Sequence, residues 1–165
     1  MLPSRIQVLW IEDEALYQLN ELLGPVLYRH RQYHLDLAVN ASEAQQKLCE
    51  SNNYDVIIVD MRIPPGEAPT WKDIYRKQGN DKNKARLGAY LIEWMLDQSN
   101  GWGQDLPRPQ NKIPATQIAI FSAEEPKAIQ NLLDYGIQVY QPKDSNYPDN
   151  VLLEIIQRVQ QIKHP

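Results

Sequence analysis

Residues 54–66 read YDVIIVDMRIPPG, and the middle of this stretch contains four consecutive β-branched apolar residues, Val56 to Val59. An unbroken apolar run of this length is typical of a strand buried on both faces of a parallel sheet. The run ends at Asp60, and the proline pair that follows cannot continue a strand. Because open α/β sheets bind ligands at the carboxyl ends of their strands, we expect Asp60 to lie at a binding edge. An Asp after a strand is also a common turn cap, and this segment alone leaves both interpretations open.

A second group of acids follows another apolar run near the N-terminus. Residues 6–11 have the pattern of a buried strand and lead directly into the acidic residues 12–14. Two parallel strands that end at the same edge would bring Glu12, Asp13 and Asp60 together. Crowded carboxylates repel one another and lose hydration, so we expect a positive charge to compensate them. A hard divalent cation with oxygen ligands, such as Mg²⁺, fits this set of acids.

The composition is that of an ordinary globular protein and excludes several classes. The chain has 165 residues, of which 42% are hydrophobic and 23% charged, which suffices for one domain with a core of its own. The net charge of −4 and the lack of a long basic run argue against nucleic-acid binding. Cys49 is the only cysteine, so no internal disulfide can form. With no signal-peptide pattern and no membrane-length apolar run, we expect a cytoplasmic protein.

Strand and helix patterns alternate along the chain. Strands are expected at 6–11, 34–39, 55–60, 117–121 and 137–140. Helices are expected at 15–27 with an interruption at Gly24-Pro25, through Ala44 and Leu48, and at 87–97, 124–134 and 149–162. Such alternation predicts an α/β fold with a doubly wound, five-stranded parallel sheet and helices on both faces. We expect residues 1–165 to form one domain.

Two long connections interrupt the alternation, at residues 65–86 and 98–116. The first is rich in Lys and Arg and is expected to be a loop with at most one helical turn, near residues 71–77. It leaves the strand that ends at Asp60, so it starts beside the predicted binding edge, whereas the second lies at the opposite edge. Long connections are often functional or disordered. The first connection is thus either a segment that gates the site or selects partners, or a passive insertion.

Two further polar residues end the last two strands. Ser122 closes the fourth strand, and Lys143 follows the fifth. A carboxylate can act as a nucleophile toward a phosphoryl group. Phosphoryl transfer needs positioning and neutralisation of charge more than any other chemistry. An ammonium group and a cation can neutralise the phosphoryl oxygens, and a hydroxyl can donate a hydrogen bond to one of them.

This set of residues, in this order, resembles the receiver domain of bacterial two-component response regulators. The matching segments are Glu12-Asp13, residues 60–64, Ser122-Ala123 and residues 140–143. Each is weak alone, but together they extend over nearly the whole chain apart from the two long connections. The resemblance implies a flavodoxin-like fold with strand order 2-1-3-4-5.

The resemblance also implies a role for the acids. Asp60 would accept a phosphoryl group from a phosphohistidine on a histidine kinase or phosphotransfer protein. Glu12, Asp13, Asp60 and the backbone carbonyl of Arg62 would hold Mg²⁺. The protein would then be a phosphoacceptor that assists its own phosphorylation and dephosphorylation, not an enzyme in the usual sense. It would act on a downstream protein target and could form a homodimer on phosphorylation.

The remaining implied roles belong to the last two strand ends. Ser122 and Lys143 would contact the phosphoryl oxygens, while Ser122 and Tyr140 would form a pair that switches on phosphorylation. Pro142 precedes the lysine, whereas the family more often has its proline after it. Aligning Gln141 with the lysine position would match that proline but would lose both the ammonium group and Tyr140. We therefore assign the position to Lys143.

Three other functions compete with a phosphoaccepting receiver. A degenerate receiver would bind a partner without being phosphorylated, although all the expected site positions carry competent residues. A phosphatase of the haloacid-dehalogenase type would need a second Asp where Arg62 stands. A flavodoxin-type flavin carrier would need a phosphate-binding loop after the first strand, where the acids of residues 12–14 would repel a phosphate.

Overall fold

The computed structural model describes residues 3–50, 53–144 and 146–163, so both ends of the predicted domain lie just outside the described residues. Its centre is a five-stranded sheet in the order β2-β1-β3-β4-β5, with every neighbouring pair parallel. The strands are β1 (Ile6–Ile11), β2 (Tyr33–Ala38), β3 (Val56–Val59), β4 (Ile118–Ser122) and β5 (Val139–Pro142). The predicted flavodoxin-like fold and its strand order are confirmed.

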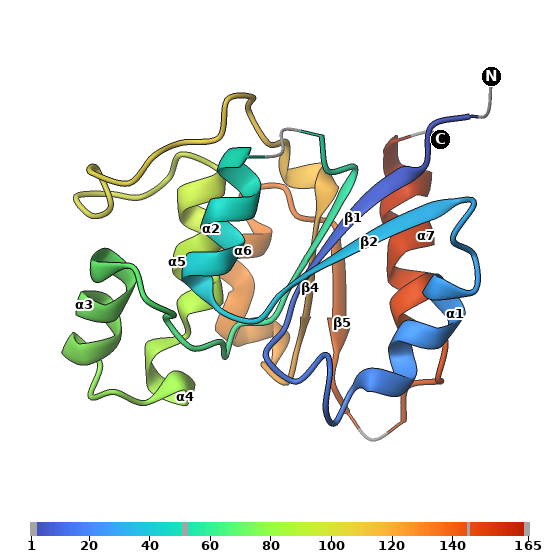
Figure 1. Cartoon of the computed structure of the whole chain (residues 1–165). Coiled ribbons are helices and arrows are strands. Elements are labelled where there is room, and N and C mark those ends of the chain that lie inside the picture. Colours follow the sequence, from blue (N-terminus) through green and yellow to red (C-terminus); the bar gives the residue numbers. More distant parts are fainter. Residues whose placement is uncertain (1–2, 51–52, 145, 164–165) are drawn as a thin grey trace.

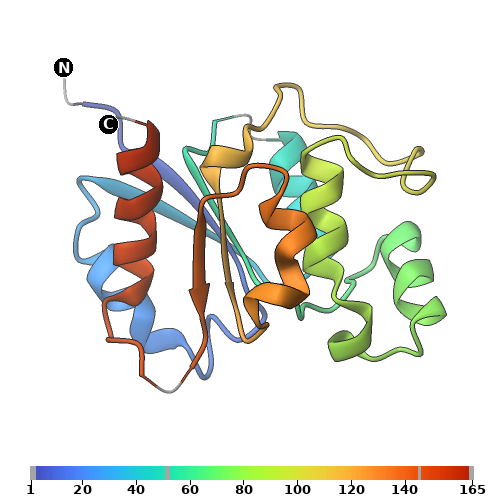
Figure 2. The ribbon, with the colours of Figure 1, turned by 180° about the vertical axis from the view of Figure 1, so that it is seen from behind.

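Helices cover both faces of the sheet, as Figures 1 and 2 show from opposite sides. One face packs against α1 (Gly24–Leu27) and α7 (Val151–Lys163), and the other against α2 (Ala41–Glu50), α5 (Leu87–Met95) and α6 (Gln130–Leu133). Alternate strand residues point to opposite faces, so Val8 and Trp10 join the first core and Leu9 and Ile11 the second. All four residues of β3 are buried, which explains its unbroken apolar sequence.

The predicted helix at 15–27 is much shorter in the structure. Residues 13–19 form turns, and only the 3₁₀ helix η1 (Asn20–Leu23) and the four-residue α1 follow. Leu16 and Leu27, two apolar residues within the predicted helix, are more than half exposed. Pro25 lies in the first turn of α1, where its missing N–H would have no partner within the helix, so it begins a helix instead of kinking one.

The prediction of a loop at 65–86 is wrong for most of the segment. It contains α3 (Pro69–Lys77) and the four-residue α4 (Lys82–Ala85), which lie beyond α5 in Figure 1. Pro69 begins α3, and Trp71 is fully buried with its indole N–H donating to the Gln45 side-chain oxygen at 3.0 Å. Trp71 is the only fully buried side chain of α3, and the partly buried Ile74 and Tyr75 pack against the same core. We refer to residues 65–86 as the insertion.

The second long connection, 98–116, has no α-helix and ends in the 3₁₀ helix η2 (Ala115–Gln117). It is nevertheless packed against the rest of the molecule. The Trp102 ring meets the edges of Trp71 and Tyr90, with ring centroids 5.6 and 5.3 Å apart. Leu106 in this connection is also buried in the same core. The two long connections therefore support each other through a cluster of aromatic rings.

The predicted helix at 124–134 is divided in the structure into the 3₁₀ helix η3 (Pro126–Ile129) and α6. Within the described part of the chain, every helix is too short or too polar to cross a membrane.

Candidate functional site

The site begins where β1 and β3 end side by side. Ile11 is paired with Val59, and the hydrogen-bond pattern continues one step further, because the Asp60 N–H donates to the Ile11 carbonyl at 3.0 Å. The Glu12 N–H likewise donates to the Ala38 carbonyl of β2 at 2.9 Å. These bonds hold Glu12 and Asp60 at the carboxyl edge of the sheet. Both side chains are almost fully buried.

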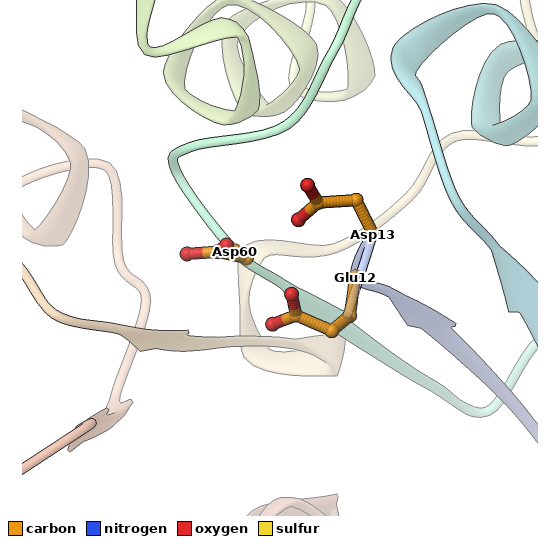
Figure 3. Close-up of side chains that lie close together, drawn as sticks. All are labelled: Glu12, Asp13 and Asp60. Carbon is orange, nitrogen blue, oxygen red and sulfur yellow. The ribbon is translucent and has the colours of Figure 1, made fainter. Parts of the chain in front are cut away.

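Three carboxylates meet at this edge, as the sequence predicts (Figure 3). One ligand atom from each of Glu12, Asp13 and Asp60 lies within 4.8 Å of the others. Burial, and then the charge of Asp60, raise the pKa of Glu12 to about 7, although Lys143 and the Glu14 N–H oppose the shift. Burial and a neighbouring carboxylate therefore both disfavour the ionised form of Glu12.

Lys143 provides the main positive charge. Its backbone N–H donates to the Ser122 carbonyl at 2.9 Å, which places it beside the ends of β4 and β5. The ammonium group forms an ion pair with Glu12 and lies 3.3 Å from an Asp60 carboxylate oxygen. The side chain is only 14% exposed and lies over the Phe121 ring, 5.3 Å from its centroid. Lys143 thus lies beside Asp60, and its contact with phosphoryl oxygens stays a prediction.

Ser122 and Tyr140 are both held by backbone groups near the site. Ser122 is fully buried, and its hydroxyl oxygen accepts a long hydrogen bond of 3.4 Å from the Met61 N–H. The Tyr140 hydroxyl donates to the Glu124 carbonyl, two residues after Ser122. Burial and neighbouring acids raise the pKa of Tyr140. The Ser122 side chain therefore contacts the backbone that follows β3, whereas Tyr140 contacts the segment that follows Ser122.

The insertion places one further cation in the site that the sequence did not identify. The Lys82 ammonium group donates to an Asp13 carboxylate oxygen at 2.7 Å. This hydrogen bond raises the pKa of Lys82. The only sequence signal was the excess of Lys and Arg in the insertion, which suits an exposed loop equally well.

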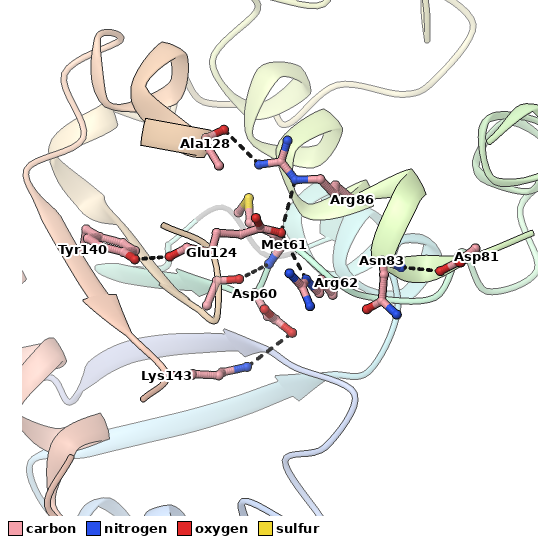
Figure 4. Close-up of polar contacts among 11 residues, drawn as sticks. Asp60, Met61, Arg62, Asp81, Asn83, Arg86, Glu124, Ala128, Tyr140 and Lys143 are labelled. Carbon is pink, nitrogen blue, oxygen red and sulfur yellow. Dashed lines mark hydrogen bonds and ion pairs between the residues drawn. The ribbon is translucent and has the colours of Figure 1, made fainter. Parts of the chain in front are cut away.

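Glu124, also missed by the sequence analysis, is a buried carboxylate held between two guanidinium groups (Figure 4). Arg62 and Arg86 donate to the same Glu124 oxygen at 3.1 and 3.2 Å. Arg86 also donates to the Ala128 carbonyl at 3.0 Å. The insertion is thereby fastened to the segment that follows Ser122. The predicted role of Arg62 concerns its backbone carbonyl, and it stays a prediction.

Gly88 lets the start of α5 pack directly against the backbone of Asp60 and Met61. A Cβ atom at this position would overlap the Asp60 carbonyl oxygen and the backbone of Met61. The Gly88 N–H donates to the Met61 carbonyl at 3.0 Å. Only a residue without a side chain lets the helix begin against the strand that carries Asp60.

The residues present fit a divalent cation. Within the described part of the chain, one Asp13 carboxylate oxygen is buried without a hydrogen-bond partner. A cavity of about 270 Å³ opens above the acids, lined by their side chains, Lys82, Lys143 and others. An unpartnered buried oxygen beside two more carboxylates is the donor set that a hard cation prefers. Glu12, Asp13 and Asp60 are therefore the residues that would hold it.

Comparisons with known proteins identify the fold but no sequence relative. No family model matches the chain, and no curated protein matches it. The receiver domain protein (CheY-like) from Methanospirillum hungatei JF-1 is 15% identical, with a TM-score of 0.58 over 97% of this chain and 98% of that one.

Two solved structures of phosphorylated response regulators are also similar. A response regulator protein from Burkholderia pseudomallei, with a phosphorylated aspartic acid, a calcium ion and citrate, is 17% identical; its TM-score is 0.55 over 96% of this chain and 71% of that one. The phosphorylated cyanobacterial phytochrome response regulator RcpA is 12% identical, with a TM-score of 0.53 over 97% and 92%. The chain has the fold of receiver domains, and at these identities the comparison establishes the fold alone.

Proposed function

We propose that this protein is a phosphoaccepting receiver of a two-component phosphorelay, with Asp60 as the phosphoacceptor. The observation that carries the proposal is the Asp60 carboxylate itself, which closes the central strand, lies 3.3 Å from the Lys143 ammonium group and shares an edge with Glu12 and Asp13. The similar structures of phosphorylated response regulators support it, since they have the same fold.

In the proposed reaction, an Asp60 oxygen forms a bond to the phosphorus atom of a phosphohistidine. The bond between phosphorus and the imidazole nitrogen breaks, and the imidazole leaves with a proton from water. Lys143 neutralises the phosphoryl oxygens, and the Ser122 hydroxyl turns from the Met61 N–H to donate to one of them. Mg²⁺, held by Glu12, Asp13, Asp60 and the Arg62 carbonyl, supplies the remaining charge neutralisation when it is bound.

The proposed partners follow from this reaction. A histidine kinase or a phosphotransfer protein in the cytoplasm supplies the phosphoryl group, and a downstream protein or a second copy of the chain binds the phosphorylated form. Ser122 and Tyr140 would transmit the change, because Ser122 contacts the Met61 N–H beside Asp60 and Tyr140 holds the Glu124 carbonyl two residues after Ser122. The protein would be a switch that assists its own phosphorylation, not an enzyme acting on a separate substrate.

Intact mass spectrometry with a small phosphodonor tests this function against a degenerate receiver. Wild type treated with phosphoramidate and Mg²⁺ should gain the mass of one phosphoryl group, and excess EDTA should prevent the gain. Because phosphoramidate needs no kinase, a missing partner cannot explain a negative result. If the mass is unchanged with Mg²⁺ while the protein is folded, the protein is a phosphorylation-independent interaction module and the proposal is wrong.

A further inference from the structure

The α4 helix of the insertion connects the acidic cluster to the segment after Ser122. At its start, Lys82 donates to Asp13 at 2.7 Å. Just past its end, Arg86 holds Glu124 and the Ala128 carbonyl. One short helix therefore contacts both the predicted cation site and the predicted switch segment.

The ammonium groups of Lys82 and Lys143 compete with a divalent cation for the carboxylates of the site. The three carboxylates already have two ammonium groups beside them, those of Lys82 and Lys143. The nearby Arg62 and Arg86 are engaged by Glu124. Both ammonium groups would repel a divalent cation added to this arrangement. Displacement of one ammonium group relieves part of that repulsion.

Of the two ammonium groups, that of Lys82 is the more easily displaced. Its side chain is 37% exposed, whereas that of Lys143 is 14% exposed and lies over the Phe121 ring. The chain enters α4 through exposed residues, among them Gly79 and Asn80, both with positive φ. Few contacts on this side oppose a displacement of the Lys82 side chain.

We propose that Lys82 is a tethered cation that occupies Asp13 in the metal-free protein and is displaced when a divalent cation binds. The inference rests on the proposed function, since it takes Glu12, Asp13 and Asp60 to be the cation site. Lys82 then lowers the apparent affinity for Mg²⁺, because its ammonium group repels the cation and competes with it for the Asp13 carboxylate. Occupation of the site by Mg²⁺ frees the start of α4, while Arg86 still holds its end to the segment after Ser122.

Calorimetric titration with Mg²⁺ at low ionic strength measures this competition. Lys82→Met keeps the aliphatic part of the side chain and removes the charge, so it should bind Mg²⁺ about three- to tenfold more tightly than wild type, the range of a partly buried ion pair. Lys84→Met is the matched control, because Lys84 lies on the same helix with an exposed side chain. Its affinity should stay within about twofold of wild type, since water and salt screen a more distant charge.

Amide exchange provides a second measurement that does not depend on phosphorylation. In wild type, Mg²⁺ should accelerate exchange over residues 80–85, because the ion pair between Lys82 and Asp13 is broken. In Lys82→Met, which lacks this ion pair, exchange there should be fast with or without Mg²⁺. Equal Mg²⁺ affinity in wild type and Lys82→Met, or weaker binding by the variant, overturns the inference and leaves the proposed function intact. If neither protein binds Mg²⁺, the proposed cation site is wrong and the inference fails with it.

Discussion

At the residue scale, the site depends on a few buried charges and one missing side chain. Lys143 compensates Glu12 and Asp60, and removal of a single partner would leave buried charge without a counter-ion. Gly88 contributes differently, since its lack of a side chain lets α5 start against the carbonyl of Asp60. The position of Asp60 is thus set as much by backbone packing as by electrostatics.

Gly88→Ala should destabilise the protein by about 1–3 kcal/mol or more, because the added methyl group must push the backbone of α5 and β3 apart. Gly24→Ala is the control, since a Cβ at Gly24 has no atom within 4 Å and the residue is already helical. That change should be neutral or stabilising by up to about 1 kcal/mol. Urea unfolding of the three proteins measures both effects. Equal midpoints for Gly88→Ala and wild type would show that the close approach has no cost.

At the element scale, the insertion is part of the folded core and not a passive loop. Trp71 is fully buried, donates a hydrogen bond to Gln45 of α2 and packs against Trp102 of the second long connection. These contacts hold α3 and so determine where α4 and Lys82 lie. The position of Lys82 in the site is therefore a consequence of packing on the far side of the insertion.

Trp71→Ala should lower the free energy of unfolding by about 3–5 kcal/mol, as expected for a large aromatic side chain removed from a packed core. Lys77→Ala, an exposed position on the same helix, should change it by less than about 0.5 kcal/mol. Chemical denaturation followed by circular dichroism measures the difference. A loss below about 1 kcal/mol for Trp71→Ala would mean that the insertion folds independently of the core.

The sequence predicted the site residues at the strand ends but missed Lys82 and the residues around Glu124. Asp60, Glu12, Ser122 and Lys143 each lie at or just after the end of a strand. Parallel strands bring their carboxyl ends to one edge, so local patterns sufficed for the sheet and for this group. Lys82 and the residues around Glu124 escaped prediction for the opposite reason. They reach the site through α3 and α4, whose positions depend on contacts between segments far apart in the chain, which periodicity does not record.

At the scale of the whole molecule, the contacts of the site lead outward through the segment after Ser122. Tyr140 of β5 and Arg86 of the insertion hold this segment, and the Ser122 hydroxyl just before it accepts a hydrogen bond from the Met61 N–H. A phosphoryl group on Asp60 would draw the Ser122 hydroxyl toward it and release one of these holds. The surface formed by η3, α6 and β5 would then change.

Beryllofluoride with Mg²⁺, which mimics a phosphoryl group on a carboxylate, should alter amide exchange over residues 122–144. The same treatment of Asp60→Asn should leave exchange unchanged, because the variant lacks the acceptor oxygen. Sedimentation of the two proteins shows whether the altered surface also binds a second copy of the chain. Unchanged exchange in wild type that has bound beryllofluoride would contradict the proposed switch.

The most direct measurement of the central claim is the intact mass of wild type and Asp60→Asn, treated side by side with phosphoramidate and Mg²⁺. Asp55→Asn is the matched control, because Asp55 lies just before the opposite end of the same strand. Wild type and Asp55→Asn should each gain one phosphoryl group, and Asp60→Asn should gain none. A phosphoryl group on Asp60→Asn, or its absence from wild type, would contradict the assignment of Asp60 as the phosphoacceptor.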